Sequence, residues 1–429
     1  MKWLRRAVIL IVLLVAMLGG WLFLGGRGDG TVPGATSPVS AATLKDPALI
    51  ARGKYLTTVG DCISCHTAQG GPDFAGGRIL PTPFGNIPTP NITPDKATGL
   101  GDWRFEDFWR ALHNGIGRHG EYLYPAFSYT SFTKVSRDDA LAIFAYLQSL
   151  APVHKPAEPL GLSFPYNVRE GLAAWRALYF REGVYQPDPS KSAAWNRGAY
   201  LVQGLGHCNE CHAARSAFGG TRALPLSGGR IPVQDWYAPD LSSHAHGGLQ
   251  GWTEQDIVDL LKNGQSARGA AFGPMAEVVA SSTQYMHDDD LRAIATYLQS
   301  LPPRAAPAPA GPVPAATAMV NQGAKIYAAS CADCHGKDGE GVAGVYPPLA
   351  GNSSVLDPSG LNAIRAVLLG GFPPTTAGNP RPYSMPPFAQ KLSDADVAAV
   401  VSYIRHAWSN DAPAVQQRDV FKYRHTPIE

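Results

Sequence analysis

The chain has 429 residues, which is enough for two or three domains of ordinary size. Hydrophobic residues make up 45% of it, a share that excludes a disordered chain and a membrane protein with many spans. Lys and Arg number 36 against 34 Asp and Glu, and this balance argues against a nucleic-acid-binding surface.

The N-terminal segment is typical of an exported protein. Basic residues come first, and an uncharged, mostly apolar run extends from Ala7 to Gly26. A run of this length can span a bilayer as a helix, with the preceding cations on the cytoplasmic side. A cleaved signal peptide is the alternative, although its apolar region is usually shorter. We therefore expect residues 1–27 to be an uncleaved membrane anchor and residues 28–47 a polar tether.

One cysteine pattern occurs three times and uses all six cysteines of the chain. Its copies are Cys62-Ile-Ser-Cys65-His66, Cys208-Asn-Glu-Cys211-His212 and Cys331-Ala-Asp-Cys334-His335. A short amphipathic stretch precedes each copy, and each repeat closes with apolar residues at i, i+3, i+4 and i+7, which predicts a second helix. Ser136 and Ser393, each with an Asp three residues later, are predicted N-terminal caps of the first and third closing helices.

The repeats divide the exported chain into six predicted segments. In chain order these are the first repeat at 48–152, a packed aromatic connector at 153–189, the second repeat at 190–303, a Pro/Ala-rich linker at 304–316, the third repeat at 317–409 and a polar tail at 410–429.

The pattern Cys-x-x-Cys-His is the attachment site of c-type haem. The two thiols form thioether bonds to the haem vinyl groups, and the adjacent His binds the iron from the proximal face. A disulfide, a redox dithiol and a zinc site are the alternatives. A redox dithiol needs no following His, and no repeat has a second cysteine pair to complete a zinc site. The sequence thus predicts three covalently bound haem c groups, attached at Cys62, Cys65, Cys208, Cys211, Cys331 and Cys334, with proximal ligands His66, His212 and His335.

The opposite face of each iron needs its own ligand, and Met is the usual partner of His in cytochromes c. Met385 lies 18 residues before Tyr403 of the third closing helix, and Met275 lies 22 before Tyr297 of the second. Met286 is the alternative in the second repeat, but it adjoins the closing helix and leaves little chain to wrap the haem. We therefore predict Met275 and Met385 as distal ligands.

The first repeat differs, because it has no methionine between His66 and His212. Phe127 lies 19 residues before Tyr146, at the position that corresponds to Met385, and a Phe cannot bind iron. Either this haem is five-coordinate or another residue reaches it. The imidazole candidates are His113, His119 and His154. A His ligand would lower the potential relative to Met, whereas an open iron would bind small ligands.

Further stretches carry a resemblance to a known family. They are Arg52-Gly-Lys-Tyr-Leu through His66, Trp195-Asn-Arg-Gly-Ala-Tyr-Leu through His212, Trp236-Tyr-Ala-Pro, Ala271-Phe-Gly-Pro-Met275 and Ser282-Thr-Gln-Tyr. Over about residues 48–409 the chain resembles the trihaem cytochrome c subunits of bacterial membrane-bound dehydrogenases of the alcohol, gluconate or sugar-alcohol type. The Tyr124-Pro-Ala-Phe127 variant is more similar to the related cytochromes that serve molybdenum hydroxylases or aldehyde dehydrogenases.

The resemblance implies an all-α chain of three tandem class I-like cytochrome c domains, which would follow the one N-terminal transmembrane helix expected from residues 1–27. It implies an electron-transfer subunit that is not catalytic on its own. Electrons would come from a dehydrogenase catalytic subunit carrying PQQ, flavin or a molybdenum cofactor, and would leave to ubiquinone or a terminal oxidase. The haem domains would lie on the periplasmic side of the inner membrane.

Two other functions stay open at this point. A peroxidase-like haem enzyme would use an open iron in the first repeat, but no distal acid–base residue with recognisable spacing accompanies Phe127. A free-standing anchored electron shuttle would need no dedicated dehydrogenase. Binding of peroxide or carbon monoxide to one haem would favour the first alternative, and purification without a dehydrogenase would favour the second.

Overall fold

The structure, a computed structural model, describes residues 39–221, 225–244, 247–303, 317–408 and 410–425, together with Trp3 and Arg6. The chain divides into two compact units. One contains His66–Tyr185 with the described part of Met1–Lys54, and the other contains Tyr55–Cys65 with the described part of Gln186–Glu429. The segment that carries the first two cysteines therefore belongs to the same unit as the second and third repeats.

Helices dominate the first repeat and its connector. The elements are α2 (Ala41–Leu44), α3 (Pro47–Val59), α4 (Cys62–His66), β1 (Ile79–Thr82), β2 (Gly85–Pro88), α5 (Phe105–Asn114), α6 (Tyr129–Phe132), α7 (Arg137–Ser149), β3 (Gly161–Leu162), the 3-10 helix η1 (Arg169–Gly171) and α8 (Leu172–Tyr179). Buried aromatic rings join α5 to α7, since Phe108 lies 5.2 Å from Phe144 between ring centroids.

The second and third repeats continue the same scheme. The second has α9 (Ala193–Tyr200), η2 (Leu201–Leu205), η3 (Cys208–Glu210), β4 (Ser227–Ile231), β5 (Trp236–Asp240), β6 (Ser243–His244), β7 (Gly247–Gly248), α10 (Glu254–Asn263), α11 (Pro274–Ser281), η4 (Thr283–Tyr285) and α12 (Asp288–Gln299). The third has α13 (Thr317–Ser330), α14 (Ala332–His335), α15 (Leu361–Leu369), α16 (Asp394–His406) and α17 (Gln417–Arg424).

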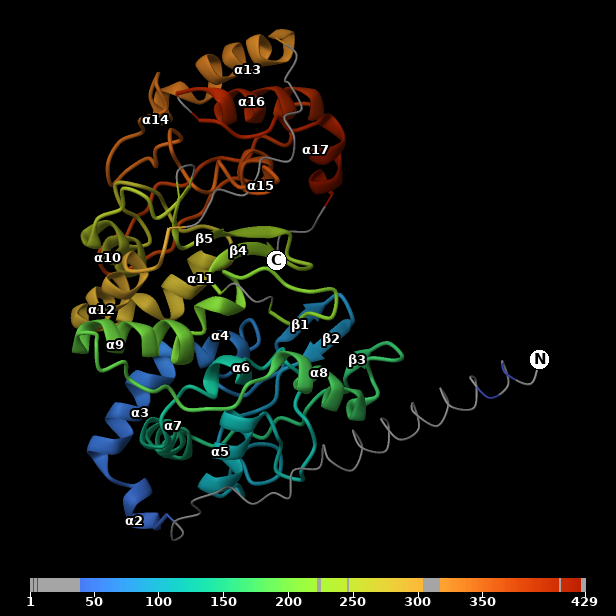
Figure 1. Ribbon diagram of the computed structural model, residues 1–429, viewed down its shortest axis with the longest axis vertical. Helices are drawn as coiled ribbons and strands as arrows, with labels where there is room; N and C mark the ends of the chain where they lie inside the picture. Colours follow the sequence, from blue (N-terminus) through green and yellow to red (C-terminus); the bar gives the residue numbers. More distant parts are fainter. Residues whose placement is uncertain are drawn as a thin grey trace. The chain divides into compact units, whose positions relative to one another are not determined.

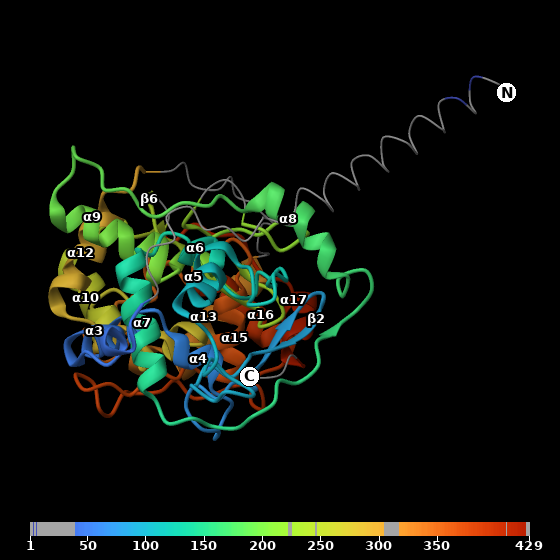
Figure 2. The same cartoon turned by 90° about the horizontal axis from the view of Figure 1, so that it is seen from below.

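In each repeat, the helix before the cysteine motif crosses the closing helix at a glycine. Figures 1 and 2 show α9 beside α12, and Figure 1 shows α13 beside α16. A Cβ atom at any of these glycines would overlap the facing carbonyl oxygen, so the two helices approach more closely than side chains allow. The three facing pairs are Gly53 with Ala142, Gly198 with Ala293 and Gly323 with Ala399.

The predicted caps of the closing helices are confirmed. The Ser136 hydroxyl accepts a hydrogen bond from the Asp139 backbone N–H at 3.2 Å. The Ser393 hydroxyl does the same for Asp396, also at 3.2 Å. Each contact satisfies one of the backbone donors that the first turn of a helix leaves unpaired.

The prediction of an all-α fold needs a correction, because the loops after the first two cysteine motifs form small antiparallel sheets. One sheet has the order β1-β2-β3, with Leu80 paired to Ile87, and another pairs β4 with β5, with Gly229 opposite Ala238. β6 pairs with β7. These strands are short and contain Gly and Pro, so they lack the alternation that reveals a strand in a sequence.

The predicted N-terminal transmembrane helix also needs a correction. No helix among the described residues is long and apolar enough to cross a bilayer. The longest of them, α13, has 14 residues, whereas about 20 are needed for a span. The run Ala7–Gly26 itself lies outside the described residues. The fold is therefore a helical chain with small sheets and without a membrane-spanning element in its described part.

The segment predicted as a polar tail contains a packed helix, α17. Val420 and Tyr423, three residues apart, are buried in the core of the third repeat. The Arg424 guanidinium contacts the Asp394 carboxylate at 2.5 Å, at the start of the closing helix. The amphipathic spacing of the two apolar residues accounts for this packing.

Candidate haem-binding sites

The three cysteine motifs all lie on single helical turns, at α4, at η3 and at α14. None of these six cysteines forms a disulfide. Burial raises the pKa of Cys62 and of Cys208 to about 12, so both thiols are neutral at physiological pH. In the second and third repeats, the two thiols and the His line one cavity, as thioether attachment requires.

Each motif His is oriented by a backbone carbonyl. The Nδ1–H of His66 donates to Pro90 O at 2.8 Å, and the Nδ1–H of His212 donates to Pro239 O at 2.7 Å. In the third repeat, His335 Nδ1–H donates to Pro347 O at 3.0 Å. Because a carbonyl can only accept, the proton is held on Nδ1, and Nε2 keeps the lone pair that an iron needs.

Burial also lowers the pKa of these three imidazoles, although the hydrogen bonds to the proline carbonyls act in the opposite direction. A neutral imidazole is the form that binds a metal. The carbonyl partners were not predicted from the sequence. Any residue type supplies a carbonyl, and the separations of 24, 27 and 12 residues form no motif.

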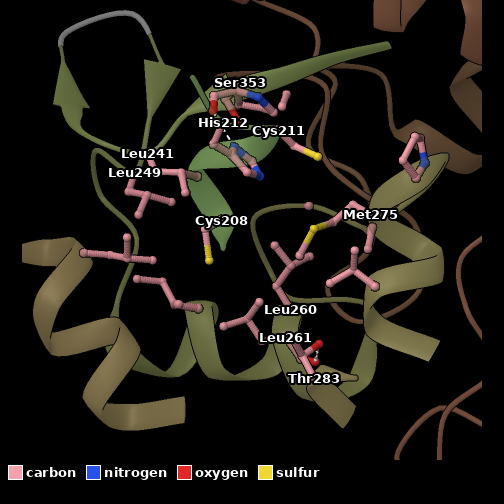
Figure 3. Close-up of a pocket in the computed structure, with 18 of the residues that line it drawn as sticks. Cys208, Cys211, His212, Leu241, Leu249, Leu260, Leu261, Met275, Thr283 and Ser353 are labelled. Atoms are coloured by element: carbon pink, nitrogen blue, oxygen red, sulfur yellow. Dashed lines mark hydrogen bonds between the residues drawn. The ribbon is translucent and has the colours of Figure 1, made fainter. Parts of the chain in front are cut away.

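The second repeat contains a large apolar cavity (Figure 3). Cys208, Cys211 and His212 lie on one wall, and Figure 3 shows Met275 on the opposite side with its sulfur directed into the cavity. Leucines fill much of the remaining wall, among them Leu249, Leu260 and Leu261. The predicted distal ligand and the predicted proximal ligand thus face one space.

Met286, the alternative ligand, is buried and also lines this cavity. It lies two residues before α12, and its carbonyl oxygen accepts a hydrogen bond from Lys262 Nζ at 2.7 Å. The choice of Met275 over Met286 stays a prediction that a mutation can decide.

The third repeat has a corresponding cavity, lined by Cys331, Cys334, His335 and Met385. Two backbone hydrogen bonds hold the Met385 loop in place. Gly371 N–H donates to Met385 O at 3.1 Å, and Met385 N–H donates to Gly371 O at 2.8 Å.

The structure does not identify a distal ligand in the first repeat. Phe127 packs against Phe132 with ring centroids 5.5 Å apart. His119 and His154 are exposed. His113 is buried and stacks on Trp109, and its two ring nitrogens lie 3.5 Å from Thr133 Oγ1 and 3.5 Å from Glu182 Oε1. These contacts give His113 a role in packing and leave its assignment as a ligand a prediction.

The residues of the second and third cavities fit haem c. A flat apolar macrocycle requires an apolar cavity, two thiols and an imidazole on one wall, and a soft sulfur ligand facing the imidazole. Both cavities are lined by two thiols, an imidazole and a Met, and Figure 3 shows the Met across from the imidazole in the second cavity.

Comparison with known families supports the same chemistry. A family model described as Cytochrome c matches residues 50–151, 196–302 and 320–408. Each matched range contains one cysteine motif and one closing helix.

Several curated proteins are similar over nearly the whole chain. The cytochrome c subunit of alcohol dehydrogenase (quinone) from Gluconobacter oxydans is 40% identical over 397 residues, which cover 89% of this chain and 83% of that protein. The gluconate 2-dehydrogenase cytochrome c subunit from Pantoea cypripedii is 38% identical, over 88% of this chain and 90% of that protein. One of the nicotinate dehydrogenase subunits from Pseudomonas putida is 42% identical over 86% of this chain, which spans 31% of that longer protein.

Proposed function

The chain belongs to the cytochrome c family, and from this premise we propose that it is the electron-transfer subunit of a dehydrogenase complex. The observation that carries the proposal is the pair of apolar cavities, each lined by a carbonyl-oriented His and a Met. Similar chains are named as cytochrome c subunits of alcohol and gluconate dehydrogenases and match almost end to end. The chain would accept electrons from a separate catalytic subunit.

Three haem c groups are part of the proposal, one in each repeat. Haem c, when bound, supplies reversible one-electron chemistry at its iron. Cys62, Cys65, Cys208, Cys211, Cys331 and Cys334 would hold the groups covalently. His66, His212 and His335 would bind on the proximal side, and Met275 and Met385 on the distal side. A thioether ligand opposite an imidazole favours the reduced state and so raises the potential.

The proposal also concerns the electron donor and the electron acceptor of the chain. The names of the similar proteins span an alcohol, a sugar acid and an aromatic acid as substrates, so they do not single out one substrate class. The catalytic subunit would carry PQQ, flavin or a molybdenum cofactor. Ubiquinone or a terminal oxidase would receive the electrons. We place the haem domains in the periplasm, because the N-terminal sequence is typical of export.

Phe127 is the observation that favours a second candidate, a peroxidase-like enzyme that uses an open iron in the first repeat. The packing of Phe127 on Phe132 supports an apolar distal side without a sulfur or imidazole at that position. A peroxidase also needs a distal acid–base group close to the iron. His113, the buried imidazole of the repeat, has its ring nitrogens next to Thr133 and Glu182, which argues against that role.

Affinity purification of the tagged chain from its own detergent-treated cells tests the proposed function. We expect a large dehydrogenase subunit to purify with it in fixed ratio, and its substrate to reduce the haems. The cofactor of that subunit would then identify the substrate class. Recovery of the holo-cytochrome alone, with no dehydrogenase able to reduce it, would contradict the proposal and favour a free electron shuttle.

A further inference from the structure

The second and third cavities share one wall. Five residues line both cavities, two from the second repeat and three from the third. They are Ala270, Phe272, Asn352, Ser354 and Asn362. Figure 3 also shows Ser353 of the third repeat among the side chains that face the second cavity. A single layer of side chains therefore separates the two spaces.

Asn362 holds this wall together from the side of the third repeat. Its side chain is 3% exposed and brackets the backbone of Tyr237 in β5. Tyr237 N–H donates to Asn362 Oδ1 at 2.9 Å, and Asn362 Nδ2–H donates to Tyr237 O at 2.7 Å. The amide thus adds a strand-like pair of hydrogen bonds between two repeats.

The strand that Asn362 holds also orients the proximal His of the second cavity. Pro239, two residues after Tyr237, supplies the carbonyl that accepts from His212 Nδ1–H at 2.7 Å. Asn362 therefore connects α15 of the third repeat to the strand that sets the orientation of His212.

The backbone of Asn362 is held within the third repeat. Its backbone N–H donates to Asp357 Oδ2 at 3.3 Å, at the start of α15. The same helix lines the third cavity with Ala363, Ala366 and Val367. One buried side chain thus joins the wall of the second cavity to a helix that forms the third.

Two further contacts join the second and third repeats near the Asn362–Tyr237 hydrogen bonds, which we call the clamp. The Arg365 guanidinium lies 4.6 Å from the ring centroid of Trp236, next to Tyr237. Asn379 Nδ2–H donates to Gln265 Oε1 at 3.2 Å, and Gln265 lines the third cavity although it belongs to the second repeat. The interface is therefore specific and polar at its edges.

We propose that Asn362 is a positioning residue that locks the third domain onto the second and thereby holds the wall through which electrons pass between their haems. The proposal rests on the proposed electron-transfer function. Electron tunnelling slows steeply with distance and with every gap in the intervening protein. Loss of the amide would leave Tyr237 N–H and C=O unpaired at the interface, and the wall would loosen.

The test compares two variants of the full holo-chain. Asn362→Ala removes the clamp, while Ala is a better helix former than Asn and leaves α15 intact. Asn410→Ala is the matched control, because Asn410 is another buried Asn whose amide brackets backbone groups. Its partners Gly351, Leu349 and Ile404 all belong to the third repeat.

Pulse radiolysis injects single electrons into the haems, and the phase of the absorbance change whose rate does not depend on protein concentration reports electron transfer within the chain. A further variant, Met385→His, identifies the phase that involves the third haem. It lowers the potential of that haem, so the phase that disappears in this variant is the one to measure. We expect Asn362→Ala to slow this phase about tenfold, as loss of the buried pair weakens the interface. Small-angle scattering should show an increased radius of gyration. Asn410→Ala should change neither quantity, although it lowers the stability of the third domain.

An unchanged rate and radius of gyration in Asn362→Ala would overturn the proposal. An equal slowing in Asn410→Ala would also overturn it, since the effect would then come from the folding of the third domain. These measurements need no partner. If no dehydrogenase reduces the chain, the proposed function fails while the rate within the chain can still be measured.

Discussion

Gly198 of α9 lies directly against the carbonyl oxygen of Ala293 of α12, with no room for a Cβ atom between the two helices. We expect Gly198→Ala to force these helices apart and to destabilise the second domain by about 1–3 kcal/mol. Chemical denaturation of the holo-chain measures the change. Gly171→Ala is the control, because a Cβ there meets nothing within 4 Å. Equal stability of the two variants would contradict the close crossing.

The glycines of the crossings recur in the sequence, although the crossings themselves were not predicted. Arg52-Gly-Lys-Tyr-Leu and its counterparts recur before each motif, and the glycine in each is where the helices cross. The caps at Ser136 and Ser393 were predicted, because local chemistry at a fixed spacing determines them. A cap depends on residues close together in the chain, whereas Gly53 and the facing residue Ala142 are far apart in it.

The contacts that sequence reasoning missed join residues far apart. Asn362 brackets Tyr237 across 125 residues, and Tyr55 Oη donates to Asp290 Oδ2 across 235 residues. Neither pair has a spacing that a pattern can reveal, because backbone carbonyls and single polar groups carry no signature of their partners. The short strands were missed for a different reason, since Gly and Pro obscure their alternation.

The distal ligand of the second haem can be decided by mutation. Met275→Leu should lower the midpoint potential of one haem, because the thioether that stabilises the reduced iron is lost. Met286→Leu changes the other methionine of the same cavity and is the control. Spectroelectrochemical titration measures both variants. A lowered potential in Met286→Leu with an unchanged Met275→Leu would transfer the assignment to Met286.

Replacement of Phe127 tests whether the distal side of the first haem is open. If the first haem is five-coordinate, the parent chain should bind carbon monoxide at one haem in three. Phe127→Met should abolish that binding and raise the potential, because it introduces a sulfur ligand at the position that corresponds to Met385. His113→Phe is the companion variant. If the parent binds no carbon monoxide, and if His113→Phe loses the spectroscopic signature of a second imidazole ligand at the first haem, then His113 is the distal ligand.

A buried carboxylate on α12 should make the stability of the second unit depend on pH. Asp290 accepts hydrogen bonds from Arg197 Nε and Nη2, both at 2.7 Å, and from Tyr55 Oη at 2.6 Å. Burial alone would raise the pKa of Asp290, but the hydrogen bonds from Arg197 and Tyr55 outweigh it and hold that pKa below its ordinary value. The charged form is therefore the one that stabilises the fold.

A lowered pKa in the folded state contributes stability above the unfolded value of about 4 and loses it as the pH falls through the folded pKa. Asp290→Asn should thus cost about 1–3 kcal/mol at pH 7, and the difference from the parent should shrink below about pH 4. Urea denaturation between pH 7 and 3 measures it. Asp289→Asn, at an exposed neighbouring position, should show almost no difference at any pH, since exposed ion pairs contribute little. A pH-independent deficit in Asp290→Asn would mean that packing, and not the carboxylate charge, holds this contact.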